Sequence, residues 1–199
     1  MKVKGFVIAI LTAGVLFLLS GCIFIAVQEN GVVTEQKRNI GEFSSVTLDG
    51  IGDINIYYSE NYKVVVTTDS NLHDSVITTV YGDVLRINQE NFNACDTAKL
   101  IIDIYMPALR KVNLNGAGNI NIFSGENSLL ILNLSGVGNI DAKHYEAENV
   151  IIDLSGAGDI KLWATDSVTG KLSGVGNILY RGNPSVNVVK TGIGNINKL

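Results

Sequence analysis

A short phrase repeated along the chain limits the folds open to this sequence more than any other feature. The phrase is a small polar residue, two glycines separated by one residue, Asn or Asp, and Ile, and it occurs six times. Its glycine pairs are Gly50 and Gly52, Gly116 and Gly118, Gly136 and Gly138, Gly156 and Gly158, Gly174 and Gly176, and Gly192 and Gly194. From the second copy onward the first glycine recurs at intervals of 20, 20, 18 and 18 residues, and a period of this length is typical of the coils of a solenoid.

Each copy of the phrase is expected to form a corner between two strands. Closely spaced glycines followed by Asn or Asp suit a backbone that turns through positive φ. We expect this conformation at both glycines of a pair, including the first glycines Gly136 and Gly156. Apolar residues alternate before the corner, as at Leu132 and Leu134, and again after it from Ile140. This period of two indicates strands with one buried face.

Stacking of the coils would bury the apolar faces that a single coil leaves exposed. The predicted inner columns are Leu114, Leu134, Leu154 and Leu172, and Ile120, Ile140, Ile160, Ile178 and Ile196. The predicted corner ladder is Asn119, Asn139, Asp159, Asn177 and Asn195, and amide ladders of this kind stabilise stacked strands. No segment between corners has the periodicity of a crossover helix. The fold class is therefore all-β, a single-stranded parallel β-helix with about 18–20 residues per coil in the C-terminal half.

Two ligand-binding interpretations of Gly-x-Gly fit the sequence poorly. A dinucleotide fingerprint needs a third glycine and a following helix, whereas a strand pattern follows each corner here. Calcium-binding nonapeptide coils need a doubled glycine and a much shorter period, and Asn at four of the six corners supplies little ligand charge. We therefore expect no cofactor and no metal.

The N-terminal segment is expected to lie outside the folded domain. Lys2 and Lys4 precede an uncharged run that ends in Leu19-Ser20-Gly21-Cys22, which resembles the lipobox of bacterial lipoproteins. This resemblance implies that residues 1–21 are a signal peptide and that Cys22 carries diacylglycerol and an N-acyl chain such as palmitate. The alternative is an uncleaved membrane helix, because the charge-free run continues from Gly5 to Val27 and is long enough to span a bilayer. Either form tethers the chain to a bacterial membrane, in the cell envelope and facing the periplasm or the exterior.

The rest of the chain divides into a polar tether and one domain. Residues 22–41 are expected to be the lipidated N-terminus and tether, and residues 42–199 the β-helix domain. Loss of Lys2 and Lys4 changes the formal net charge from -4 to -6, which argues against nucleic acid as a partner. After Cys22 only Cys95 remains, so an intrachain disulfide is excluded and Cys95 is expected to be structural or exposed.

The repeat is interrupted by a long interval between Gly50 and Gly116. Alternating, β-branched segments predict strands over 62–68, 76–81, 84–88 and 99–105, with a turn at Tyr81-Gly82-Asp83. Residues 71–75 are compatible with a single helical turn. We interpret this part as wider or less regular coils that begin and cap the solenoid.

The order of these motifs resembles the head-GIN domain family. The matching residues are Gly41-Glu42-Phe43-Ser44-Ser45-Val46, the first corner, the Tyr81-Gly82-Asp83 turn, Met106-Pro107-Ala108-Leu109-Arg110-Lys111-Val112 and the serial corners. The family comprises auto-transporter adhesins found largely in bacterial envelope lipoproteins. The resemblance implies a right-handed parallel β-helix and supplies no catalytic residues. Lys190, where earlier coils have Leu, departs from the pattern and marks the last coil as an edge. A second subunit covering that edge or a lateral face would give a homo-oligomer.

Several charged residues are candidates for catalytic chemistry. Some β-helices are polysaccharide lyases or hydrolases, for which the candidates here are Asp141, Asp159, Lys161 and Arg181. Asp141 and Lys161 are expected to lie side by side and to neutralise one another, so solvated surface charge is the preferred interpretation.

The histidines and aromatics are expected to have structural or surface roles. His73 and His144, the latter near Glu146 and Glu148, are expected in surface loops rather than at a metal. The aromatic residues Tyr145, Trp163 and Tyr180 occur in successive coils and would either form a strip for sugar stacking or pack locally.

The leading functional hypothesis is a non-enzymatic, lipid-anchored envelope protein that presents a rigid β-helix for adhesion or assembly. Its expected partners are the membrane, through the anchor, and a surface glycan or protein. The alternatives are a carbohydrate-active enzyme on the same scaffold and a periplasmic sensor or assembly factor.

Overall fold

The computed structural model describes residues 27–91 and 99–199, and the predictions for residues 1–21, Cys22 and Cys95 lie outside these ranges. The described chain is all-β, apart from one short 3-10 turn, η2 (His73–Ser75). The strands are β1 (Val33–Arg38), β2 (Ser45–Leu48), β3 (Asp53–Tyr58), β4 (Lys63–Asp69), β5 (Val76–Tyr81), β6 (Val84–Gln89), β7 (Ile101–Met106), β8 (Lys111–Leu114), β9 (Ala117–Ile122), β10 (Glu126–Leu134), β11 (Val137–Leu154), β12 (Ile160–Leu172), β13 (Ile178–Arg181), β14 (Ser185–Lys190) and β15 (Ile196–Lys198).

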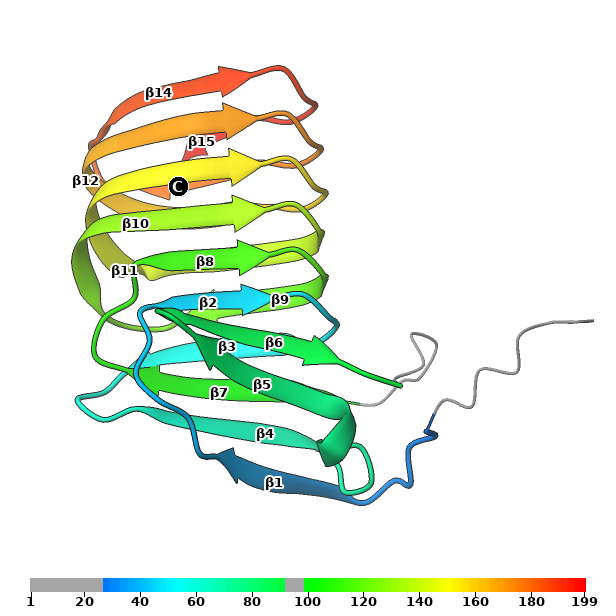
Figure 1. Ribbon diagram of the computed structural model, residues 1–199. Helices are drawn as coiled ribbons and strands as arrows, with labels where there is room; N and C mark the ends of the chain where they lie inside the picture. Colours follow the sequence, from blue (N-terminus) through cyan, green and yellow to red (C-terminus); the bar gives the residue numbers. More distant parts are fainter. Residues whose placement is uncertain (1–26, 92–98) are drawn as a thin grey trace, which may run out of the picture.

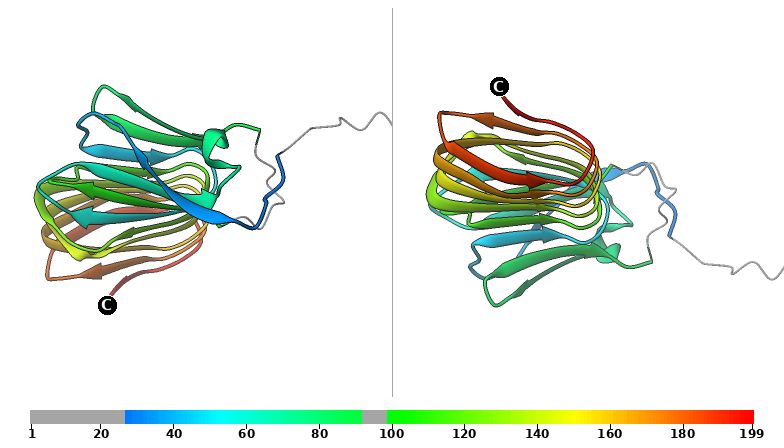
Figure 2. Two further views of the ribbon diagram at one scale, coloured as in Figure 1. Left: turned by 90° about the horizontal axis from the view of Figure 1, so that it is seen from below. Right: turned by 90° about the horizontal axis from the view of Figure 1, so that it is seen from above.

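The C-terminal part is a β-solenoid, as predicted. Strands that precede a corner form one wall, here called the approach wall, in which β2, β8, β10, the second half of β11, the end of β12 and β14 pair in parallel. Strands that follow a corner form the exit wall, from β3 through β9, the first part of β11, the start of β12 and β13 to β15. The approach wall is turned to the viewer in Figure 1 and the exit wall lies behind it. Seen end-on in Figure 2, the coils form a flattened ring.

Both predicted inner columns are confirmed. Leu134 pairs with Leu114 and Leu154, and Ile140 pairs with Ile120 and Ile160, in register. Except for the half-buried Ile196, every member of the two columns is fully buried. A one-residue slip would turn each of these side chains to solvent, so the apolar alternation fixes the register of the stack.

The first corner stacks directly on the second despite the long interval between them in the sequence. Strand β2 pairs in parallel with β8, and β3 pairs in parallel with β9. The four strands predicted in the interval are present as β4, β5, β6 and β7.

The interval does begin and cap the solenoid, as expected, but antiparallel pairs rather than wider or less regular coils form most of it. The turn at Gly82 reverses the chain, so β5 pairs antiparallel with β6, and β4 pairs antiparallel with β7. Only β6 and β7 extend the parallel walls, beside β2 and β3. The antiparallel strands cover the N-terminal end of the stack (Figure 1).

The expected tether is also shorter than predicted. Residues 33–38 form β1, which pairs antiparallel with β4 from Val33 opposite Asp69 to Arg38 opposite Val64. The polar sequence of β1 suits an edge strand, where most side chains stay exposed.

Both glycines of a corner lie close to the backbone of the preceding coil, but only the second also takes positive φ, which corrects the expectation of positive φ at both. The second glycine does take positive φ, as at Gly138 with φ 135°. The first does not. A Cβ at Gly136 would instead lie 1.9 Å from the carbonyl oxygen of Gly116 in the preceding coil. The first glycine is therefore required by the close approach of successive backbones.

Candidate functional site

The outer face of the exit wall carries an ordered array of polar and aromatic side chains. In β3 the side chains of Ile54 and Ile56 are buried, so Asp53, Asn55 and Tyr57 face outward by strand alternation. The same alternation in the neighbouring strands produces three outward rows that run along the solenoid axis. We call them the corner row, the middle row and the aromatic row, in order of distance from the glycine corner.

The corner row is a continuous hydrogen-bonded ladder, which confirms the prediction and adds Asp53 to it. Asn119 Nδ2 donates to Asp53 Oδ1 at 3.0 Å, and Asn139 Nδ2 donates to Asn119 Oδ1 at 2.9 Å. The side chain of Asp159 has no N–H group, so the backbone N–H of Asp159 donates to Asn139 Oδ1 instead, at 3.0 Å. The Asp159 carboxylate then accepts from the Asn177 backbone at 2.7 Å. The ladder orients each side chain through its neighbours, so this row is preorganised.

The middle row contains amide side chains beside Asp103 and charged side chains further along the solenoid. Asn55 Nδ2 donates to Asp103 Oδ1 at 2.9 Å, and Asn121 Nδ2 donates to Asn55 Oδ1 at 3.2 Å. Asp141 follows and is paired in register with Lys161, as predicted.

The expected neutralisation of Asp141 by Lys161 is wrong. Asp141 binds Lys143, whose Nζ lies 2.8 Å from Asp141 Oδ2, because residues two apart on a strand share a face. Within the described residues Lys161 forms no ion pair within 4.0 Å, so its ammonium group faces the array without a carboxylate partner.

The aromatic row contains three stacked rings, from β3, β7 and the residue that follows β9. The ring centroids of Tyr57 and Tyr105 are 5.1 Å apart, and those of Tyr57 and Phe123 are 5.0 Å apart, with interplanar angles of 21° and 8°. Lys63 Nζ lies 4.8 Å from the Tyr105 ring centroid at one end of the stack. Phe123, at the other end, is 46% exposed. Burial, with the nearby Asp103 carboxylate, raises the pKa of Tyr57, which keeps its hydroxyl a neutral donor.

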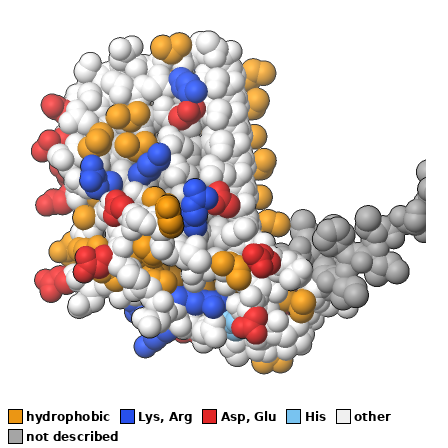
Figure 3. Space-filling view, viewed as in Figure 1, with side chains coloured by type: hydrophobic (Ala, Val, Ile, Leu, Met, Phe, Trp, Pro, Cys, Tyr) orange, Lys and Arg blue, Asp and Glu red, His pale blue; other side chains and the backbone are white. Residues whose placement is uncertain are grey.

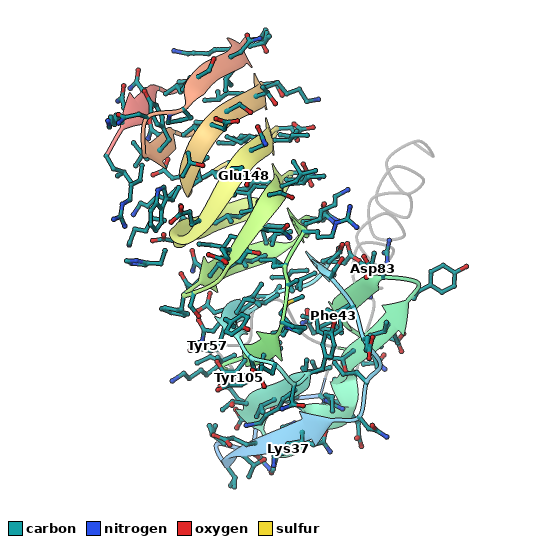
Figure 4. The ribbon with its side chains drawn as sticks, turned by 90° about the vertical axis from the view of Figure 1, so that its left-hand side faces the viewer. Lys37, Phe43, Tyr57, Asp83, Tyr105 and Glu148 are labelled. Carbon is teal, nitrogen blue, oxygen red and sulfur yellow. The ribbon has the colours of Figure 1, made fainter. Side chains whose placement is uncertain are left out.

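A second aromatic contact lies further along the row. The Arg181 guanidinium is 4.1 Å from the centroid of the Trp163 ring, and these residues are register partners in β13 and β12. Figure 4 shows Tyr57 and Tyr105 projecting side by side, away from Glu148.

A shallow hollow of about 410 Å³ lies over the corner and middle rows. Its lining consists of Asp53, Asn119, Asn121, Asn139, Ile140, Asp141, Asp159 and Lys161. The amides, carboxylates and ammonium group of the hollow can hydrogen-bond to hydroxyl groups, and the exposed ring of Phe123 in the neighbouring row can stack on an apolar ring face. This chemistry suits a sugar chain or a polar protein segment.

The structure brings together only part of what the sequence suggested for chemistry. Asp141, Asp159 and Lys161 line one hollow, whereas Arg181 stacks on Trp163 in the next row. Since Asp159 Oδ1 accepts two hydrogen bonds from Asn177, this carboxylate acts as a link in the ladder.

The predicted aromatic strip of Tyr145, Trp163 and Tyr180 is not assembled. Tyr145 is buried, and its hydroxyl donates to the carbonyl oxygens of Leu109 at 2.8 Å and Glu126 at 3.1 Å. Tyr180 is partly buried and packs against the core, as its alternation predicted. Local packing is therefore the correct interpretation for both residues.

The two histidines lie in different environments. His144 is exposed, as expected, but it lies within β11 rather than in a loop. His73 is buried, with Nε2 at 2.9 Å from Thr34 Oγ1, so its assignment to a surface loop is wrong. Glu146 and Glu148 line a separate hollow with Glu126. Among the described residues no group of three His, Cys, Asp or Glu side chains has the geometry of a metal site.

The stack of Tyr57, Tyr105 and Phe123 was missed from the sequence. Its rings come from β3, β7 and the residue that follows β9, and the interrupted repeat conceals the pairing of these three strands. The sequence did contain one signal for this stack, the equivalent position of Phe123 and Tyr57 in their coils. Phe123 follows Ile120 and Ile122 as Tyr57 follows Ile54 and Ile56.

Across residues 27–91 and 99–199, no helix is both long and apolar enough to cross a membrane.

Comparisons with known proteins point to one family and one fold. A family model described as "Putative auto-transporter adhesin, head GIN domain" matches residues 42–127 and 116–184. A search of curated proteins found no match.

Several solved structures have a fold similar to that of this chain. The crystal structure of a putative adhesin from Bacteroides fragilis is 20% identical, with a TM-score of 0.59 over 87% of this chain and 100% of that one. A putative lipid binding protein from Parabacteroides distasonis is 19% identical, with a TM-score of 0.49 over 87% and 99% of the two chains. A putative adhesin from Parabacteroides merdae is 21% identical, with a TM-score of 0.44 over the same shares. At these identities the likeness concerns the fold.

Proposed function

The chain belongs to the putative auto-transporter adhesin, head GIN domain family, and from that premise we propose that it is a non-catalytic protein of the cell envelope that adheres through the outer face of its exit wall. The observation that carries this proposal is the ordered array on that face. A hydrogen-bonded ladder and a stack of three rings, of which Phe123 is exposed, run in parallel along one wall. Because these groups are held in place before binding, a ligand loses little affinity to ordering them.

The ligand class that best fits the array is a glycan. Hydroxyl groups of a sugar chain would hydrogen-bond to the amides and carboxylates of the hollow, and a pyranose face would lie against Phe123 at the open end of the ring stack. A protein segment rich in polar side chains is the alternative ligand.

Binding to immobilised oligosaccharides tests this proposal. The full chain is passed over neutral hexose, N-acetylhexosamine and uronic acid oligomers, alongside Phe123→Ala and a control, Ile151→Ala. Ile151 is 42% exposed on the approach wall, so the control removes an exposed apolar side chain from the opposite face. Loss of a stacking ring should weaken binding about ten-fold or more in Phe123→Ala and leave Ile151→Ala unchanged. Equal affinity of all three proteins, or no binding to any oligomer, would refute adhesion to glycans through this face.

We also propose that Cys22 carries the membrane anchor. The support is the Leu19-Ser20-Gly21-Cys22 sequence after an uncharged run. The full chain produced in a bacterial host should incorporate a labelled fatty acid and lose residues 1–21, and Cys22→Ser should not incorporate the label. A parent chain that floats with membranes, keeps residues 1–21 and takes up no label would instead favour a retained membrane helix.

A carbohydrate-active enzyme is the second candidate, because Asp141 and Asp159 line the same hollow. Hydrolysis or elimination of an oligosaccharide that is lost in both Asp141→Ala and Asp159→Ala, but kept in Asp153→Ala on the approach wall, would establish this function instead.

A further inference from the structure

The corners form an apolar ridge along one edge of the solenoid. The residue between the two glycines of each corner is Ile51, Ala117, Val137, Ala157, Val175 or Ile193. Of these, Val137 is 62% exposed, Val175 53% and Ile193 73%. The flanking glycines carry no side chains, so the central residue alone projects from the bend. Figure 3 shows the hydrophobic side chains as a single file along the right-hand edge.

The polar residues beside the ridge carry few charges. The position before each glycine pair is Asp49, Asn115, Ser135, Ser155, Ser173 or Thr191. Asp49 is the one charged member, and its Oδ2 lies 3.0 Å from Arg86 Nη1. On the other side, the corner row is amide except at Asp53 and Asp159. A partner that binds through complementary charge therefore fits this edge poorly, whereas an apolar surface fits it.

The N-terminal end of the described chain enters the fold at the same edge. The start of β3 follows the first corner and pairs with the start of β7, at Asp53 and Ile101. Ile101 is opposite Thr67 near the end of β4, and Asp69, which ends β4, is opposite Val33. The start of β1 therefore lies on the corner side of the molecule (Figure 1).

Residues 28–31 are fastened to the end of β4. Asn71 Nδ2 donates to the carbonyl oxygen of Gln28 at 2.6 Å, Asn30 Nδ2 donates to Ser70 Oγ at 2.8 Å, and Gly31 N–H donates to Asp69 Oδ1 at 2.6 Å. This segment also exposes apolar side chains: Val27 is 37% exposed, Val32 56% and Val33 52%. Four of the fourteen exposed large hydrophobic side chains of the described chain therefore lie on the ridge itself, namely Ile51, Val137, Val175 and Ile193, and three more lie in the segment that enters the fold at this edge.

We propose that this corner ridge lies against the lipid bilayer, so that the solenoid axis runs parallel to the membrane. The proposal rests on the anchor at Cys22 described above. The short segment from Cys22 to Val27 spans at most about 18 Å when fully extended. Since residues 28–31 are fixed to the corner side, an anchor at Cys22 holds that edge close to the membrane.

The bilayer is a better occupant of the ridge than a second copy of the chain. A single file of Val, Ile and Ala offers far less area than the roughly 800 Å² per partner of a stable protein interface. Next to a membrane to which the chain is already tethered, weak apolar contacts suffice, because the anchor raises their effective concentration. In this orientation neither wall faces the membrane, so the hollow of the exit wall stays open to a ligand.

Quenching by brominated lipids tests the proposal. The full chain, with Cys95→Ser and its anchor intact, is labelled with an environment-sensitive fluorophore at Val175→Cys on the ridge or at Ile151→Cys on the approach wall. It is reconstituted into vesicles of phosphatidylcholine and phosphatidylglycerol, with and without bromine on the acyl chains. The ridge label should shift to the blue and lose most of its emission to bromine, and the wall label should do neither. Val137→Ser and Ile193→Ser introduced together should abolish quenching at position 175 while the protein still floats with vesicles.

The possible outcomes of this experiment test the ridge contact and the Cys22 anchor separately. Flotation with equal quenching at both positions overturns the ridge contact alone. Failure to float overturns the anchor and with it the ridge contact. A blue shift without bromine quenching, together with a doubled mass, means that a second copy covers the ridge, and this also overturns the proposal.

Discussion

The side-chain amide of Gln89 completes the first corner by binding both backbone groups of Ile51. Ile51 N–H donates to Gln89 Oε1 at 2.6 Å, and Gln89 Nε2 donates to the Ile51 carbonyl oxygen at 2.9 Å. In the next coil the equivalent residue, Ala117, makes these two bonds with Gly50 O and Gly52 N of the coil below. Gln89 thus imitates the missing coil and caps the N-terminal end of the corner stack.

Removal of this cap should destabilise the fold. Gln89→Ala leaves two backbone groups without protein partners, and each lost hydrogen bond contributes about 0.5–1.5 kcal/mol. The free energy of unfolding from urea titration should fall by roughly 1–2 kcal/mol. Asn187→Ala removes an exposed amide from β14 and should change it by less than about 0.5 kcal/mol. Equal effects of the two substitutions would mean that Gln89 is not a cap.

Replacement of the first glycine of a corner even by alanine should destabilise the fold. At Gly156 a Cβ would lie 2.1 Å from the carbonyl oxygen of Gly136, so Gly156→Ala must push two coils apart. We expect a loss of about 2 kcal/mol or more in urea titrations. Gly82 has a φ of +60° with nothing within 4 Å of a Cβ, and Gly82→Ala should cost only about 1–2 kcal/mol of backbone strain. A milder effect at Gly156 than at Gly82 would contradict the close approach of the coils.

The corner ladder should show a graded response at Asn139. Its Nδ2 donates to Asn119 and its Oδ1 accepts from the Asp159 backbone. Asn139→Asp keeps the acceptor and loses the donor, whereas Asn139→Ala loses both. The expected losses in stability are roughly 1 kcal/mol and roughly 2 kcal/mol, measured by urea denaturation. The ladder would be energetically unimportant if both variants were as stable as the parent chain.

Tyr145 should make stability depend on pH in the alkaline range. Burial raises its pKa, whereas an unfolded tyrosine ionises near pH 10. From about pH 10 upward the unfolded chain loses this proton first, so stability that is complete below pH 10 falls until the folded group also ionises.

Tyr145→Phe removes this dependence. The variant should be less stable by roughly 1–3 kcal/mol at neutral pH, because the carbonyl oxygens of Leu109 and Glu126 lose their donor. Its deficit relative to the parent should shrink as the pH rises above about 10. A deficit independent of pH would contradict the raised pKa.

The repeating part of the fold could be predicted from the sequence because its signals are local. Alternation within each coil fixes which face is buried, and the constant phrase fixes the register, so the Leu134 and Ile140 columns follow directly. The two glycine roles could not be separated in this way. Positive φ is a property of one residue, whereas the contact of Gly136 with Gly116 O depends on the spacing between coils.

The candidate site was less predictable, because long-range pairing assembles it. Asp141, Asp159 and Lys161 were found from the repeat, since they lie in regular coils. The stack of Tyr57 with Tyr105 and Phe123 depends on which strands pair across the long interval between the first two corners. The sequence of the interval has no repeat from which that pairing could be predicted. The ion pair of Asp141 with Lys143 could not be predicted from the repeat, because Lys161 is the register neighbour of Asp141 and Lys143 is the next outward residue on the same strand.

A disulfide across the interval measures most directly whether the first corner joins the stack that forms the binding face. Asn55 and Asn121 are register neighbours on the exit wall although they are far apart in the sequence. In a Cys95→Ser background, Asn55→Cys with Asn121→Cys should oxidise to an intramolecular disulfide in the folded protein. The pair Asn55→Cys with Asp141→Cys lies in the same row but two coils apart, about 10 Å, and should stay reduced. Rapid oxidation of the first pair alone is the result that the stacked face predicts, and oxidation of the second pair, or of neither, would contradict it.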